Sequence, residues 1–202
     1  MPGDPSLLTE AGWAESRGGT RNNLFYSFDV GAVHVAILST EHDLSPGSIQ
    51  LAWLEADLRA LDRAQRPFVL LGLHRPVYTS TKGGSALPET AGMQAALEPL
   101  LLRHRVTIVV AGHYHQYERS CRVAAGECMP PPSNGTVHIT AGIGGVQHHE
   151  EWLSPQPAWV ETQSVDRYGF MLLEVVNRTH AKVQVVDSTD HDAVFDEFWV
   201  TA

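Results

Sequence analysis

Three histidines occupy positions from which they could bind a metal ion. His74 directly follows an apolar run that begins at Pro67, and His113 and His115 follow a second apolar run, 106–110. Imidazole nitrogen is a common ligand for zinc, iron and related ions. Because side chains alternate along an extended strand, His113 and His115 would project from the same side. If the chain instead turns after Gly112, the two histidines could fan out toward two neighbouring metal ions. The pattern therefore indicates metal binding, and ordinary packed or surface histidines are the competing interpretation.

Apolar runs predict the strands that carry these histidines. The runs at 33–39, 67–73 and 106–110 have few polar residues, which is typical of buried strands. A further run, 24–30, precedes the first of them and is predicted to form a hairpin with it. His74 and His113 would then lie at the carboxyl ends of neighbouring strands.

Two helices are predicted between these strands. Four leucines between residues 51 and 61 recur at helical spacing, and Ser45 and Pro46 are suited to the N-cap and first turn. A second apolar stripe covers 93–101, where Pro99 is expected to bend or break the helix. Alternating strands and helices favour a parallel sheet with right-handed crossovers, in which ligands gather at the carboxyl ends of the strands. We therefore expect His74, His113 and His115 to converge in one crevice.

The chain shows no linker between independent domains, but the type of predicted secondary structure changes along it. Residues 1–22 show neither helical nor strand periodicity and are interpreted as a flexible lead or loop. Residues 23–202 form the folded part, with a βαβ portion at 23–134 and a closing β-rich segment at 135–202. The closing segment is expected to contain antiparallel strands at 136–140, 169–176, 181–186 and 194–200.

Charge and hydropathy exclude several classes of partner. The 202 residues include 14 Lys and Arg against 23 Asp and Glu, a formal charge of −9, and no basic run is present. Nucleic acid and anionic membrane are therefore excluded as partners. No stretch approaches the roughly 20 apolar residues of a spanning helix, and the first residues lack the apolar core of an export signal. We expect that the chain neither spans a membrane nor carries its own signal.

Four further residues suggest covalent modification. Cys121 and Cys128 form an even pair across a polar interval, which favours a disulfide in a surface loop over two buried free thiols. Asn134 and Asn177 each begin an Asn-x-Thr triplet in a predicted loop or turn, so both are candidate glycosylation sites. Together they indicate an exported parent protein.

Two segments that contain the histidines resemble motifs of a known family. Residues 71–76 (Leu-Gly-Leu-His-Arg-Pro) and 112–119 (Gly-His-Tyr-His-Gln-Tyr-Glu-Arg) are similar to the fourth and fifth metal-binding motifs of the purple acid phosphatases, which belong to the calcineurin-like metallophosphoesterases. The resemblance extends over about residues 24 to 200. It implies an α/β fold, a metallophosphoesterase-type β-sandwich flanked by helices, of which only the C-terminal part is present.

The resemblance also implies roles for individual residues. His115 would bind a ferric ion, while His74 and His113 would bind a divalent partner, Zn, Mn or Fe. Side chains that flank the histidines in the sequence would orient these ligands, namely Arg75, Tyr117, Glu118 and Arg119. The family's first three motifs, which supply its aspartate, asparagine and tyrosine ligands, would lie before residue 1.

By resemblance, the parent protein would be a secreted acid phosphatase that hydrolyses phosphate monoesters through a metal-bound hydroxide at a two-metal centre. Because three neutral imidazoles cannot offset the repulsion between two metal ions, we expect the isolated chain to be poorly active or inactive. Its protein partners would be a second copy of itself or a separate N-terminal half. Two alternatives remain: a non-catalytic fragment or pseudoenzyme that acts in binding, and a hydrolase with one zinc ion held by His74, His113 and His115.

Overall fold

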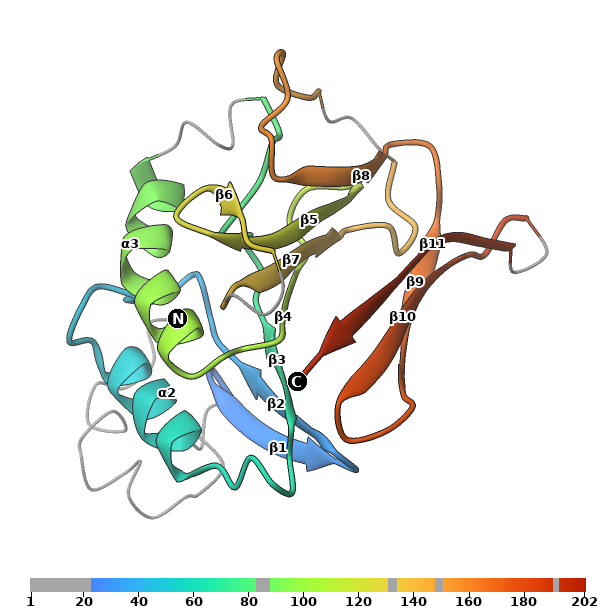
Figure 1. The fold of residues 1–202 in the computed structure, drawn as a ribbon. Helices are drawn as coiled ribbons and strands as arrows, with labels where there is room; N and C mark the ends of the chain where they lie inside the picture. Colours follow the sequence, from blue (N-terminus) through green and yellow to red (C-terminus); the bar gives the residue numbers. More distant parts are fainter. Residues whose placement is uncertain (1–22, 83–87, 131–133, 148–150, 191–192) are drawn as a thin grey trace.

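A computed structural model describes residues 23–82, 88–130, 134–147, 151–190 and 193–202, so the expected lead at 1–22 lies outside the described residues. Within the described residues, no helix is long and apolar enough to cross a membrane. The described residues form two sheets and the helices between their strands, arranged as in Figure 1. In chain order, the elements are β1 (Tyr26–Val30), β2 (Val33–Ile37), α2 (Ile49–Ala60), β3 (Phe68–Gly72), α3 (Pro88–Arg103), β4 (Ile108–Ala111), β5 (Tyr117–Ala124), β6 (Glu127–Cys128), β7 (Thr136–Ala141), β8 (Val160–Ser164), β9 (Gly169–Val175), β10 (His180–Asp187) and β11 (Ala193–Thr201).

The larger sheet contains the predicted parallel strands. Its order is β1-β2-β3-β4-β7-β5-β6, and β8 pairs with β5. The pairings of β2 with β3 and of β3 with β4 are parallel, whereas β1 and β2 form the predicted antiparallel hairpin. The expectation that residues 136–140 would pair only in antiparallel fashion is wrong. Strand β7 pairs parallel with β4 and antiparallel with β5, so it joins the two halves of the sheet.

The smaller sheet and the helices cover opposite faces of the larger one (Figure 1). Strands β9, β10 and β11 form the expected antiparallel sheet. Its inward side chains, such as Val183 and Val185, pack with Ile108 and Ile139 of the larger sheet. On the other face, Leu54 of α2 and Leu97 of α3 belong to a separate core cluster with strand residues. The result is a β-sandwich flanked by helices, as predicted.

The start of α2 differs from the sequence prediction. Ser48, not Ser45, is the N-cap, and its Oγ accepts a hydrogen bond from the backbone nitrogen of Leu51 at 3.4 Å. Gly47 has φ +88°, a left-handed conformation that a right-handed helix cannot include. The carbonyl oxygen of Ser45 instead accepts the Ser48 nitrogen at 3.0 Å. Residues 45–48 therefore form a turn before the helix.

Helix α3 continues through Pro99, so the alternative that this proline would break the helix is wrong. Proline removes one backbone donor, which destabilises an isolated helix. Leu97 and Leu101 on either side of it are 0% and 1% exposed, and they belong to the core beneath α2 and α3. Burial of this apolar face stabilises the helix across the missing hydrogen bond.

The two predicted portions of the chain share a sheet. Strands β7 and β8 come from the segment 135–202, yet β7 lies between β4 and β5 of the preceding portion. The division at residue 134 therefore separates strands that belong to one hydrogen-bonded sheet. The description of the chain as two portions stays a prediction.

Candidate metal centre

His74 and His113 meet at the carboxyl ends of β3 and β4. The segments that follow β3 and β4 continue the pairing of the two strands, because Leu73 N donates to Val110 O at 2.9 Å and Gly112 N donates to His74 O at 3.0 Å. The Nδ1 atom of His113 lies 3.1 Å from the Nε2 atom of His74. The two ring planes are nearly perpendicular, at 82°. Two of the three predicted ligands are therefore brought together, as parallel strand ends should do.

His115 does not join this pair. Within the parts of the chain that the structure describes, no group of three His, Cys, Asp or Glu side chains is placed to hold a metal ion. The expectation that three histidines converge is therefore corrected to a pair, and the arrangement for a zinc ion held by three histidines is not formed.

Two tight turns explain the separation of His115 from the pair. His113 has φ +66°, and Tyr114 N donates to Gly112 O across it at 2.8 Å, while Gln116 N donates to Tyr114 O across His115 at 2.9 Å. Each hydrogen bond closes a three-residue turn. The backbone is therefore not extended between the two histidines, and the alternation rule that placed them on one side does not apply.

The His74–His113 pair suits a shared divalent ion. Imidazole nitrogens bind zinc at about 2.0–2.1 Å, so two of them on one ion at octahedral or tetrahedral angles stand about 2.9–3.4 Å apart. The observed separation of 3.1 Å, at which the two rings share a hydrogen bond in the structure, falls within this range. Two neutral imidazoles are fewer ligands than such an ion requires, so the pair fits part of a metal site.

Arg75 joins the loop beside His74 to the loop after β2. Its backbone nitrogen donates to Thr40 Oγ1 at 3.0 Å, and its guanidinium makes a forked contact to Glu41 at 2.7 and 3.2 Å. Hydrogen bonding to Arg75 lowers the pKa of Glu41 below its ordinary value. The fork therefore holds the position next to His74, although an orienting role of Arg75 toward the ring stays a prediction.

Glu118 clamps the loop that follows His74. Its buried carboxylate accepts the Ser80 backbone nitrogen at 3.0 and 3.1 Å, together with the Ser80 hydroxyl. Gln163 of β8 donates to the same carboxylate at 3.1 Å. Burial raises the pKa of Glu118 despite these hydrogen bonds. Nothing in the sequence pattern singled out Ser80 or Gln163, because they lie 38 and 45 residues from Glu118.

Tyr117 and Arg119 point to the opposite side of β5 and join the two sheets. The Tyr117 hydroxyl donates to Asp196 Oδ2 at 2.6 Å, and Arg119 donates to both carboxylate oxygens of Asp196 at 2.7 and 3.1 Å. The Arg119 guanidinium also lies 4.4 Å from the centre of the Phe198 ring. These contacts direct both side chains toward β11, and a role of either residue in orienting the histidines stays a prediction.

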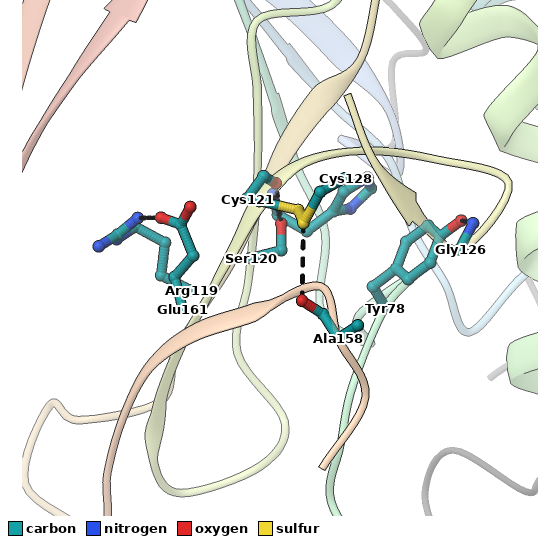
Figure 2. The surroundings of a disulfide bond; sticks show 9 residues. Tyr78, Arg119, Ser120, Cys121, Gly126, Cys128, Ala158 and Glu161 are labelled. Atoms are coloured by element: carbon teal, nitrogen blue, oxygen red, sulfur yellow. Dashed lines mark hydrogen bonds and ion pairs between the residues drawn. A yellow bond between two sulfur atoms is a disulfide. The ribbon is translucent and has the colours of Figure 1, made fainter. Parts of the chain in front are cut away.

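The predicted disulfide between Cys121 and Cys128 is confirmed, with 5.7 Å between the two Cα atoms. The cysteines lie on paired strands β5 and β6 rather than in a loop. Figure 2 shows the bridge beside the segment that leads into β8. The Cys128 sulfur lies 3.6 Å from the carbonyl oxygen of Ala158, and Cys121 N donates to Trp159 O at 2.8 Å. The disulfide therefore closes the hairpin to which β8 is attached.

Both candidate glycosylation sites are on the surface. Asn134 is exposed, precedes β7, and donates to the carbonyl oxygen of Leu102. Asn177 lies in the turn between β9 and β10, where its Oδ1 accepts the Thr179 and His180 nitrogens at 2.8 and 2.9 Å. Glycosylation of either residue stays a prediction.

Comparisons with known proteins point to one family. Residues 135–197 match the family described as iron/zinc purple acid phosphatase-like protein C. The chain is 36% identical over 187 residues to purple acid phosphatase 18 of Arabidopsis thaliana, covering 91% of this chain and 41% of that protein. It is 31% identical over 207 residues to probable inactive purple acid phosphatase 9 of the same plant, covering 96% of this chain and 31% of that protein.

A solved structure agrees with these sequence matches. Purple acid phosphatase PPD1 from yellow lupin (Lupinus luteus) seeds superposes with a TM-score of 0.79 at 28% identity, over 87% of this chain and 32% of that chain. The chain thus spans about a third to two fifths of the length of these relatives. Sequence and fold agree over nearly all of it, and the chain belongs to the purple acid phosphatase family.

Proposed function

We propose that the protein contributes to an acid phosphatase that hydrolyses phosphate monoesters at a centre of Fe(III) and a divalent metal. In this proposal, His74 and His113 hold the divalent ion. The observation that carries it is the 3.1 Å separation of their facing nitrogens at the carboxyl edge of the parallel strands. The pairing also supports the assignment of His115 to the other ion, because within the described residues His115 does not form a three-ligand group with the pair.

Bound metal ions would polarise the phosphate ester and activate a water nucleophile. The residues of this chain would bind the divalent ion and fix the positions of its ligands. His74 and His113 would ligate as neutral imidazoles, while the Arg75–Glu41 fork and the Glu118–Ser80 clamp would fix the loop between them. Because paired ions about 3.5–4 Å apart need anionic ligands, the chain would require carboxylates from another segment. We therefore infer that the 202 residues alone have little or no phosphatase activity.

Metal titration tests the role of the histidine pair. We expect the purified chain to bind Zn²⁺ or Co²⁺, with at least tenfold weaker binding in His74→Ala and His113→Ala. His180→Ala, an exposed histidine on β10, is the matched control and should bind as the unaltered protein does. Equal affinity in His113→Ala and the unaltered chain would contradict the proposal.

Activity measurements test the rest of the proposed function. The chain would be assayed with 4-nitrophenyl phosphate, alone and mixed with the separately produced amino-terminal half of purple acid phosphatase 18. We expect activity only in the mixture, and its loss with His113→Ala. Metal-dependent turnover by the 202 residues alone would overturn the inference that they are incomplete.

A non-catalytic role is the second candidate, because two of the relatives are named probable inactive purple acid phosphatases. In that case the chain would keep the fold as a binding surface. Metal content separates the two candidates: a mixture that binds no metal and turns over no ester would favour the binding role.

We also infer that the parent protein is exported. The disulfide supports this inference, because such bonds persist in oxidising compartments, and both sequon asparagines are exposed. Mass spectrometry of the protein produced in a secreting eukaryotic host should detect glycan at Asn134 or Asn177. Complete absence of glycan at both, with the disulfide reduced in the source cells, would contradict export.

A further inference from the structure

Positive charge without a carboxylate partner gathers at the edge of the sheet opposite the histidines. Of the ten arginines in the described parts of the chain, six form ion pairs with Asp or Glu. Both described lysines are also paired. The other four, Arg63, Arg105, Arg122 and Arg178, have no Asp or Glu carboxylate within 4.0 Å among the residues that the structure describes.

Three of these four arginines line two adjoining cavities, which we call the arginine cleft. The first cavity, about 650 Å³, is lined by Arg105 and Arg122, and the second, about 400 Å³, by Arg63 and Arg105. Arg105 and Ala202 line both cavities, so the cavities meet at these residues. Even with a carboxylate at Ala202 counted, three unpaired guanidinium groups leave the cleft with an excess of positive charge.

The arginines of the cleft repel one another. Arg63 donates to the carbonyl oxygens of Pro67 and Arg105 at 2.9 and 3.2 Å, which satisfies its hydrogen bonds without neutralising its charge. Burial and the nearby charge of Arg105 lower the pKa of Arg63 below its ordinary value. A bound anion would relieve this repulsion between like charges.

Hydrogen-bond donors are available in the larger cavity. The Thr107 Oγ1 atom accepts the Val69 nitrogen at 3.1 Å, and Thr201 Oγ1 accepts Arg122 at 3.0 Å, so the hydroxyl proton of each can be donated. Both threonines line this cavity with Arg105 and Arg122. Guanidinium groups and hydroxyls are the side chains that bind tetrahedral oxyanions, because the planar guanidinium presents paired donors.

We propose that the arginine cleft binds a multivalent oxyanion of the phosphate or sulfate class, with Arg105 and Arg122 as its main ligands. The cleft is separate from the metal centre. Thr107 precedes β4 and His113 follows it, and six residues of nearly extended chain span about 20 Å. The site therefore needs no metal and does not depend on the proposed phosphatase function.

An NMR titration of the whole chain with inorganic phosphate, in EDTA and at constant ionic strength, tests the proposal. We expect saturable shifts in the amides of Val106, Thr107 and Gly135. Sulfate should compete with phosphate, whereas chloride at equal ionic strength should not. Non-saturable shifts, or shifts confined to residues 112–116, would overturn the proposal.

Variants distinguish phosphate binding in the arginine cleft from phosphate binding at other positively charged side chains. Arg105→Gln should fold normally, because this side chain is exposed and donates no hydrogen bond within the described structure, and it should weaken phosphate binding about tenfold. Arg105→Gln combined with Arg122→Gln should abolish saturation. Arg178→Gln removes an unpaired arginine outside the cleft, and His113→Ala alters the metal centre; both should bind phosphate within twofold of the unaltered chain. Undiminished binding in Arg105→Gln would refute the assignment.

Discussion

The buried carboxylate of Glu118 receives both the backbone nitrogen and the hydroxyl of Ser80, and so ties β5 to the loop that leaves His74. The two residues belong to the segments that follow the two histidine-bearing strands. A second hydrogen bond runs in parallel, from Gln116 Nε2 to Thr81 Oγ1 at 2.7 Å. The position of His74 relative to His113 therefore depends on contacts beyond the strands themselves.

Glu118→Ala should destabilise the fold by about 1–3 kcal/mol, because it leaves the Ser80 nitrogen buried without an acceptor. We expect a smaller loss in Glu118→Gln, which keeps one acceptor oxygen, and weaker Zn²⁺ binding in the alanine variant. Urea unfolding and metal titration measure the two effects. Glu174→Ala, at an exposed position on β9, is the control. Wild-type stability and metal affinity in Glu118→Ala would show that the clamp is unimportant.

Gly142→Ala should displace the histidine loop. A Cβ atom at this position would overlap the carbonyl oxygen of Tyr114 and approach the Cα atom of His115 to 3.3 Å. We expect a loss of about 1–3 kcal/mol, typical of overpacking, and altered NMR shifts of the His113 and His115 rings. Gly144→Ala is the matched control, because its Cβ would meet nothing within 4 Å. Equal behaviour of the two variants would contradict the close approach.

His34 should make stability depend on pH. Its ring nitrogens each lie 2.8 Å from a carboxylate oxygen, one of Asp29 and one of Asp57. Burial opposes the charged ring, yet the hydrogen bonds to Asp57 and Asp29 outweigh burial and raise the pKa of His34 above its ordinary value of 6.5. The folded state thus holds this proton more tightly than the unfolded state.

The stabilisation from His34 should be complete below pH 6.5 and should decline as the pH rises through the raised pKa. Urea unfolding across pH 5.5–9 measures this decline. His34→Gln should lose roughly 2 kcal/mol at low pH, where charged hydrogen bonds are removed, and should show a flatter profile. A profile of the same slope in the variant would assign the pH dependence to another group.

Asp196→Ala should be among the most destabilising single changes between the two sheets. It would leave Arg119 and the Tyr117 hydroxyl, both on β5, without their shared acceptor. Removing one partner of a buried ion pair costs about 3–5 kcal/mol when the other charge is left alone, and we expect a value near the lower limit because Arg119 keeps its ion pair with Glu161. Glu197→Ala removes the neighbouring exposed carboxylate and should cost less than about 1 kcal/mol. Thermal unfolding compares the two, and similar midpoints would contradict the role of Asp196.

Local sequence pattern was sufficient for the parallel strands and for the meeting of His74 and His113. Both histidines directly follow apolar runs, and the geometry of parallel strands brings such ends together. The same pattern failed for β5, because Glu118 and Arg119 resemble loop residues. Both side chains are buried, where Glu118 contacts Ser80 and Arg119 contacts Asp196. Because these partners are distant in the sequence, they leave no periodic pattern near position 118.

Backbone conformation accounts for the other errors. Gly47 adopts a left-handed conformation in the turn before α2, so the N-cap is Ser48 and not the predicted Ser45. The positive φ of His113 breaks the extended backbone that the predicted convergence of His113 and His115 required. The sequence left a turn after Gly112 open as an alternative but could not decide for it, since positive φ is uncommon for residues other than glycine.

The turn at His113 also bears on how the pair would meet a ligand. The hydrogen bond across this residue and the register with the His74 strand hold both rings near each other in the folded chain. The entropy of ordering them is lost on folding, before any ion arrives, so the pair is preorganised. Substitutions that relax this turn should then weaken ion binding even when every ligand atom is retained.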